Sequence, residues 1–132
     1  MRIQVKDFMS APVTTAMAED NINEIRTLMV ENGIHAIPII SYTNDKLKVD
    51  MTIQGIITAT DICKEVSDDA TVADIMSTSI VHVVHLESSA KSAAKMMLKH
   101  KVHHIIAMEN GEIKGMISAL DFVKLVAEHS LE

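Results

Sequence analysis

Apolar and polar positions along the chain follow two alternating periods, and the whole succession occurs twice. In the first half, a short β-like run at 13–16 precedes apolar residues at 22, 25, 28 and 29, which share one face of a helix. Apolar strands are expected at 36–40 and 53–57, followed by a closing helix at about 60–66. The second half repeats this order with a strand at 80–84, a helical stripe at 90, 93, 94 and 97, strands at 104–108 and 113–117, and a closing helix at about 119–128. The pattern predicts one β-α-β-β-α unit in each half.

Local signals support these boundaries. Asn21 with Glu24 is expected to cap the start of the first helix, and Gly33 is expected to end it. Asn110 and Gly111 are typical of a tight hairpin turn between the last two strands.

Three short blocks of sequence recur in the same order, which indicates an internal duplication. The blocks are VKDFMS at 5–10 and VADIMS at 72–77, GIHAIP at 33–38 and KVHHII at 101–106, and GIITATD at 55–61 and GMISALD at 115–121. The first copy is longer because of a polar loop at 41–52, where Asn44 and Asp45 indicate a turn. We therefore expect two repeats, 1–68 and 69–130, integrated into one α/β module (an α+β sandwich), and interpret 131–132 as a remnant of cloning.

The composition excludes several classes of function. The net charge of −6, from 12 basic and 18 acidic residues, does not suit nucleic acid, and three aromatic residues cannot build a base-stacking surface. A single cysteine, Cys63, excludes a disulfide framework and a cysteine-based zinc site. No apolar run approaches 18 residues, and no secretory leader is evident, so a soluble cytoplasmic protein is expected.

The recurring Gly-x-x-(Thr/Ser)-x-x-Asp motif allows two interpretations. In the first, Thr58 or Ser118 caps a helix, and Asp61 or Asp121 completes a capping box at the positive helix end. In the second, the same helix start binds phosphate, and the carboxylate accepts hydrogen bonds from both hydroxyls of a ribose. A single copy favours the cap alone, whereas two copies at matched positions leave the two interpretations about equal.

Histidines also recur at one position of the repeat, as His35 and His103. A histidine at a strand edge is usually solvated or hydrogen-bonded, but its repetition favours a role beside phosphate.

Neither a metal site nor catalysis is expected. Five histidines cluster in the second half, yet His82 and His85 are three apart on a strand and point to opposite faces. No metal-binding or nucleophile motif is present, and Cys63 is interpreted as a small apolar residue.

Taken together, the doubled unit, its Met-Ser start, its (Val/Ile)-His pair and its Gly-x-x-(Thr/Ser)-x-x-Asp motif resemble a tandem pair of cystathionine-β-synthase (CBS) domains, or Bateman module. The resemblance covers 5–66 and 72–128. It implies two repeats packed sheet to sheet around a pseudo-two-fold axis, with two clefts that bind adenosine-containing ligands such as AMP, ADP, ATP or S-adenosylmethionine. It also implies pairing into homodimers through helices and regulation of another protein.

The same resemblance implies two sites, each drawing on both repeats. The first would place Asp121 on the ribose, Ser118 and His103 near phosphate, and Ser10, Val13, Thr14, Ile34 and Ala36 around the adenine. The second would place Asp61 on the ribose, Thr58, Thr60 and His35 near phosphate, and Ser77, Ile80, Val81, Val102 and His104 around the adenine. The segment 58–61 closely resembles the nucleotide-binding repeats of the AMP-activated protein kinase gamma subunit.

Departures from the family pattern bear on the ligand. Ala36 and His104 stand where many nucleotide-binding members carry arginine, and Thr60 and Leu120 replace a frequent basic residue. Because so few cations remain to neutralise a triphosphate, AMP or ADP is favoured over ATP. AMP or ADP is also the expected ligand in preference to S-adenosylmethionine.

The leading hypothesis is a non-enzymatic, nucleotide-sensing regulatory module that signals to an unknown effector protein. The alternative is a ligand-free dimerisation or protein-interaction module. Ligand-induced stabilisation discriminates between them.

Overall fold

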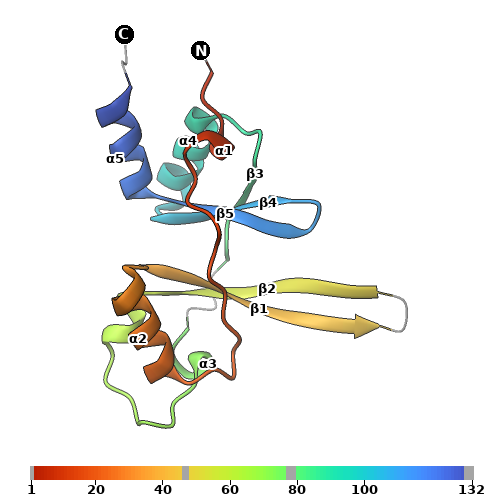
Figure 1. The fold of residues 1–132 in the computed structure, drawn as a ribbon, viewed down its shortest axis with the longest axis vertical. Coiled ribbons are helices and arrows are strands. Elements are labelled where there is room, and N and C mark those ends of the chain that lie inside the picture. Colours follow the sequence, from red (N-terminus) through yellow and green to blue (C-terminus); the bar gives the residue numbers. More distant parts are fainter. Residues whose placement is uncertain (1, 46–47, 77–79, 130–132) are drawn as a thin grey trace. The chain divides into compact units, whose positions relative to one another are not determined.

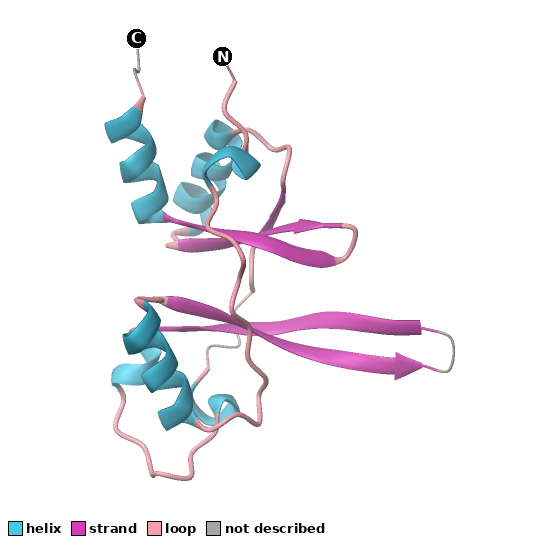
Figure 2. Ribbon diagram, in the orientation of Figure 1, coloured by secondary structure: helices cyan, strands magenta, loops and turns pink. Residues whose placement is uncertain are grey.

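The computed structural model describes residues 2–45, 48–76 and 80–129, and its contacts divide the chain into two compact units (Figures 1 and 2). The central unit comprises Thr14–Val81. The C-terminal unit comprises His82–Glu132 together with the N-terminal segment Met1–Val13. The predicted mixture of helices and sheets is confirmed, with a two-stranded sheet in the first unit and a three-stranded sheet in the second.

The central unit contains α2 (Ile22–Asn32), β1 (Ala36–Asp45), β2 (Lys48–Thr58), the 3-10 turn η1 (Asp61–Cys63) and α3 (Val72–Ile75). The expected cap of α2 is confirmed, since the Asn21 side chain accepts hydrogen bonds from the backbone N–H groups of Asn23 and Glu24. Gly33 ends the helix at φ 62°, a left-handed conformation that glycine adopts without penalty. The apolar face of α2 packs on the antiparallel β1–β2 pair.

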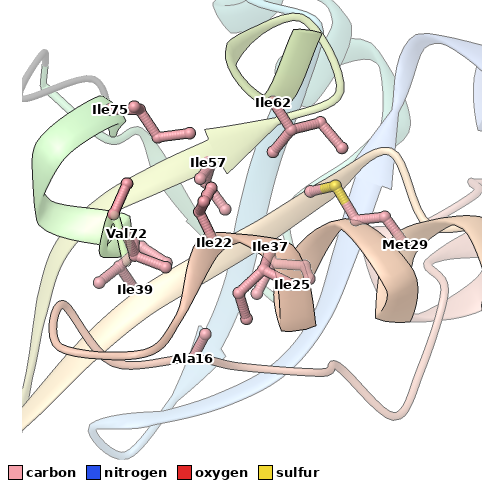
Figure 3. Packing of buried hydrophobic residues seen from close by; sticks show 11 residues of the cluster. Ala16, Ile22, Ile25, Met29, Ile37, Ile39, Ile57, Ile62, Val72 and Ile75 are labelled. Atoms are coloured by element: carbon pink, nitrogen blue, oxygen red, sulfur yellow. The ribbon is translucent and has the colours of Figure 1, made fainter. Parts of the chain in front are cut away.

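Figure 3 shows the core of the central unit. It is almost entirely aliphatic and includes Ala16, Ile22, Ile25, Met29, Ile37, Ile39, Ile57, Ile62, Val72 and Ile75. Residues from α2, both strands, η1 and α3 all enter it, so the turn that carries Asp61 is anchored through its neighbour Ile62.

The C-terminal unit contains α1 (Val5–Phe8), β3 (Val83–His85), α4 (Ala90–His100), β4 (His104–Glu109), β5 (Glu112–Ser118) and α5 (Ala119–Glu128). Strand β4 lies between β3, to which it is parallel, and β5, to which it is antiparallel. The predicted hairpin turn is confirmed by the positive φ angles of Asn110 and Gly111, 53° and 76°. The core comprises Val5, Val84, Ala93, Met97, Ile105, Ala107 and Ile117.

The first segment of each repeat packs in the core of the other repeat. The N–H of Val5 donates to the Ser88 carbonyl at 2.8 Å, and the Val5 side chain is fully buried among residues of the second repeat. In the same way, the N–H of Val72 donates to the Asp20 carbonyl at 2.9 Å, and its side chain joins the core of the first repeat. The boundaries 1–68 and 69–130 therefore mark the repeats in the sequence. Each compact unit instead contains the first segment of the other repeat.

Two predictions for the first repeat are wrong. The closing helix expected at about 60–66 is only the 3-10 turn η1, because the polar run that follows Val66, at 67–69, offers no further apolar positions to bury. The loop expected at 41–52 is a continuation of the hairpin, with Tyr42 paired to Met51 and Asn44 to Val49. Residues of high β propensity outweigh the turn signal there.

The short strands that precede α2 and α4 are also shorter than expected. Within 13–16 the structure has a single bridge, from Ala16 to Ile39, and the strand expected at 80–84 is the three-residue strand β3 at 83–85. Among the helices of the described residues, none is sufficiently long and apolar to cross a membrane.

Candidate functional site

Asp121 lies where β5 turns into α5, and its two carboxylate oxygens have different surroundings. Oδ2 accepts the backbone N–H of Ser118 at 2.8 Å, while the Ser118 hydroxyl accepts the N–H of Asp121 at 3.3 Å. Oδ1 accepts a longer hydrogen bond, 3.4 Å, from the hydroxyl of Ser10. The structure thus brings together three of the residues expected at the first nucleotide site, Asp121 for the ribose, Ser118 for phosphate and Ser10 for the adenine.

Ser10 reaches this carboxylate because the N-terminal segment pairs with β5. The N–H of Ser10 donates to the Met116 carbonyl at 2.8 Å, and the N–H of Met116 donates to the Ser10 carbonyl at 2.9 Å. Gly115 permits this approach, since a Cβ atom there would lie 2.8 Å from Cγ of Met9 and 3.0 Å from the Ser10 carbonyl oxygen. The contact of Gly115 with Met9 was not predicted, because it joins residues far apart in the chain.

Asp61 repeats the arrangement in the central unit. Its Oδ2 accepts both the backbone N–H of Thr58, at 2.9 Å, and the Thr58 hydroxyl, at 3.1 Å. Asp61 is the first residue of a 3-10 turn, whereas Asp121 lies in the first turn of a ten-residue α-helix. Ser77, the counterpart of Ser10, lies outside the described residues.

The capping interpretation of the motif is confirmed for Ser118 and Asp121, which form a reciprocal capping box. The same box occurs twice elsewhere, where Asp7 accepts the N–H of Gln4 and Asp74 accepts the N–H of Thr71, both at 2.8 Å. A cap alone therefore does not distinguish Asp121, but the approach of Ser10 to its second oxygen does.

The two recurring histidines lie next to these motifs. The backbone carbonyl of His103 accepts the N–H of Ala119 at 3.0 Å, and that of His35 accepts the N–H of Ala59 at 2.9 Å. Both histidine side chains are exposed. Each is thus held by its backbone beside the capping hydroxyl of its own unit and is free to meet solvent or ligand.

The other expected site residues are divided between the two units. Of those assigned to the first site, Val13 belongs to the C-terminal unit, and Thr14, Ile34 and the buried Ala36 belong to the central unit. Of those assigned to the second, the exposed Thr60 and Ile80 and the half-buried Val81 belong to the central unit, and Val102 and His104 to the C-terminal unit.

No cluster of three or more histidine, cysteine or carboxylate residues suited to a metal ion occurs in 2–45, 48–76 and 80–129. Two histidine contacts lie away from the motifs. His82 stacks on His100, with ring centroids 3.9 Å apart and planes at 21°, and Nε2 of His85 is 3.9 Å from Oε2 of Glu109.

The stacked pair predicts a pH dependence of stability. Loss of hydration, followed by repulsion from His82 and from Lys99, lowers the pKa of His100 below its ordinary value of 6.5. The unfolded chain then binds more protons at this residue, so stability is fully present above about pH 6.5 and is lost as the pH falls through the lowered pKa. We expect His100→Gln to reduce the acid-induced loss of stability in urea titrations between about pH 7 and pH 5.

A matched control for that experiment is His129→Gln, which removes an exposed histidine just after α5. An acid-induced loss of stability in His100→Gln as steep as in the parent would contradict the prediction.

The fold and the duplicated motif define a two-repeat α+β module with one carboxylate-bearing site motif per repeat. The CBS domain family model matches residues 5–68 and 72–128, and the chain belongs to this family. It is a CBS domain pair, which is a regulatory module.

Known proteins contain or share this module. The chain is 29% identical over 119 residues, 89% of its length, to inosine-5'-monophosphate dehydrogenase of Korarchaeum cryptofilum, and 27% identical over 128 residues, 96% of its length, to homoserine O-acetyltransferase of Methanosalsum zhilinae. These matches span only 23% and 25% of the two relatives. Among solved structures, the CBS domain pair of protein MJ0100, in complex with 5'-methylthioadenosine and S-adenosyl-L-methionine, superposes with a TM-score of 0.77 at 23% identity, covering 96% of this chain and 98% of that one.

Proposed function

We propose that this chain is a ligand-sensing regulatory module that binds an adenosine-containing ligand through Asp121 and Asp61 and signals to a partner protein. The observation that carries the proposal is the carboxylate of Asp121, whose Oδ2 is oriented by Ser118 while Oδ1 accepts only a long bond from Ser10 among the hydrogen bonds found in the described residues. The Ser10 bond is long, so a ribose hydroxyl that approaches this oxygen more closely replaces it with a stronger bond. A hydrogen bond to a carboxylate contributes about 1.5–3 kcal/mol.

Two further observations support an adenosine ligand. The motif that presents Asp121 recurs around Asp61 with the same Thr or Ser partner, so each repeat carries one carboxylate of the same geometry. A CBS domain pair of similar fold is complexed with two adenosine derivatives. The exposed side chains of His35 and His103 lie beside these motifs, where phosphate would be bound.

For this chain we infer AMP or ADP as the ligand rather than ATP. The net charge is −6, and arginine is absent from 36 and 104, so a triphosphate would lack neutralising cations. S-adenosylmethionine, which carries a sulfonium cation and no phosphate, is the competing ligand within the same proposal.

The response to ligand would reach a partner through self-association of the module. Helix α5 has an outer stripe, Leu120, Val123 and Val126, whose exposed fractions are 56%, 61% and 54%. The opposite side of α5 packs on the core through Phe122, whose ring meets that of Phe8 edge to face at 5.1 Å. An exposed apolar stripe of this kind suits a homodimer through helices. The same stripe favours the second candidate function, a dimerisation and interaction module that needs no ligand.

A thermal-shift panel tests the proposal. AMP, ADP, ATP, S-adenosylmethionine and NADH are added separately, and any ligand present at about 100 times its dissociation constant should add about 2.7 kcal/mol to the free energy of unfolding. We expect stabilisation by AMP or ADP and calorimetric binding by the same compound. No shift with any of the five would contradict the proposal and favour the ligand-free module.

A further inference from the structure

The chain that follows Asp61 is held very differently from the chain that follows Asp121. After Asp121, helix α5 continues to Glu128 and pairs its own carbonyl groups. After Asp61, the turn η1 ends at Cys63, and its backbone bonds are long: the N–H of Cys63 donates to Thr60 at 3.3 Å and that of Lys64 to Asp61 at 3.4 Å. Something other than helical bonding must keep this segment in place.

Arg26 on α2 takes the carbonyl that the missing helix would have used. Its Nε and Nη2 both donate to the Ile62 carbonyl oxygen, at 3.2 and 2.9 Å, and its Nη1 donates to Oδ1 of Asn23 at 2.6 Å. The guanidinium is half-buried, and its planar fork matches a single acceptor with two donors.

The first turn of α2 holds the same segment further along. Nδ2 of Asn21 and Nδ2 of Asn23 both donate to the Asp68 carbonyl, at 3.0 and 3.4 Å. In the second repeat, the residue on α4 that corresponds to Arg26 is Ala94. Helix α5 needs no such support, because its own backbone hydrogen bonds hold it. The polar face of α2 therefore replaces, in the first repeat, the backbone bonds of a closing helix.

We propose that Arg26 is a positioning residue for the ligand site at Asp61, an inference that rests on the proposed function. Ile62 directly follows Asp61 in the chain. Because Arg26 fixes the direction of the Ile62 carbonyl, it limits the backbone rotations that orient the Asp61 carboxylate. The Ile62 side chain is held in the core. Arg26 supplies the second fixed point, and without it the backbone that follows Asp61 retains its two long 3-10 bonds, while the Asp61 carboxylate keeps its bonds to Thr58. The Asp61 site depends on Arg26, and the Asp121 site does not.

Two backgrounds isolate the sites for calorimetry with AMP and, separately, with S-adenosylmethionine. Asp121→Ala leaves only the Asp61 site, and Asp61→Ala leaves only the Asp121 site. We expect Arg26→Gln to weaken binding about tenfold in the first background and to leave it unchanged in the second. Arg26→Lys, which keeps the charge but has one nitrogen in place of the fork, should recover part of the affinity. Arg2→Gln, at an exposed N-terminal position, is the matched charge control.

A readout without ligand accompanies these titrations. Amide hydrogen exchange at 61–64 should accelerate about tenfold in Arg26→Gln while the amides of α2 keep their protection. Equal affinities in the Asp121→Ala background with and without Arg26, or unchanged exchange at 61–64, would overturn the inference. Failure of the parent chain to bind either probe would instead refute the proposed function. Hydrogen exchange at 61–64 would then still test whether Arg26 holds the turn in place.

Discussion

Replacing Ile25 by alanine is expected to lower the free energy of unfolding by about 2–5 kcal/mol, because it removes three methyl or methylene groups from a closely packed core and leaves a cavity. Ile25 is 5% exposed on the inner face of α2, in a cluster with Ile37, Ile57 and Met29. The midpoint of urea denaturation, followed by circular dichroism, measures the change.

The same helix offers the control. Val30 is 76% exposed, so Val30→Ala should change stability by no more than about 0.5 kcal/mol. Equal destabilisation by the two substitutions would show that the inner face of α2 does not pack on the β1–β2 pair as described.

The second large effect concerns binding. Asp121→Ala should weaken the affinity of its site for AMP or S-adenosylmethionine roughly ten- to hundredfold, because a charge-assisted hydrogen bond to ribose is lost. Binding at the Asp61 site should be unchanged. Calorimetric titration measures both the affinity and the number of sites that remain.

Loss of the helix cap complicates Asp121→Ala, and the chain itself supplies the correction. Asp74→Ala removes a capping carboxylate that accepts the N–H of Thr71 at 2.8 Å, a contact of the same length as that between Asp121 and Ser118. Both variants should lose about 1 kcal/mol of stability from the missing cap, but only Asp121→Ala should lose ligand affinity. Equal affinities in the two variants would remove Asp121 from the site.

Much of this architecture could be predicted from local sequence, because local chemistry decides it. Asn21, Gly33 and the Asn110–Gly111 pair act within a few residues of themselves, and each occupies the expected position. The duplication was visible for the same reason, since recurring blocks need no tertiary information.

The errors fall where distant groups decide the outcome. The first closing helix is replaced by a short turn, whose carbonyl at 62 and the later carbonyl at 68 are bound by polar side chains of α2. A periodicity cannot reveal such contacts. The sequence holds one signal of this difference, since Arg26 in the first repeat corresponds to Ala94 in the second.

For the candidate site, the recurring motif predicted the pairing of Ser118 with Asp121, because a capping box is local. The place of His103 beside them came from the family resemblance, and the structure bonds its backbone carbonyl to Ala119. It could not show that Gly115 admits the N-terminal segment, which depends on a close approach between residues about a hundred positions apart in the chain. The pairing of β1 and β2 through Tyr42 and Met51 was missed because turn-forming residues lie within strands there.

The exchange of first segments means that neither repeat can be cut out at its sequence boundary and remain whole. A fragment starting at 69 would lack Val5, which fills its core, and would carry Val72 with no cavity to enter. Each repeat thus completes the core of the other with its first segment, and a protease that cut the chain near 81 would leave the segment 1–13 packed in the core of the C-terminal unit.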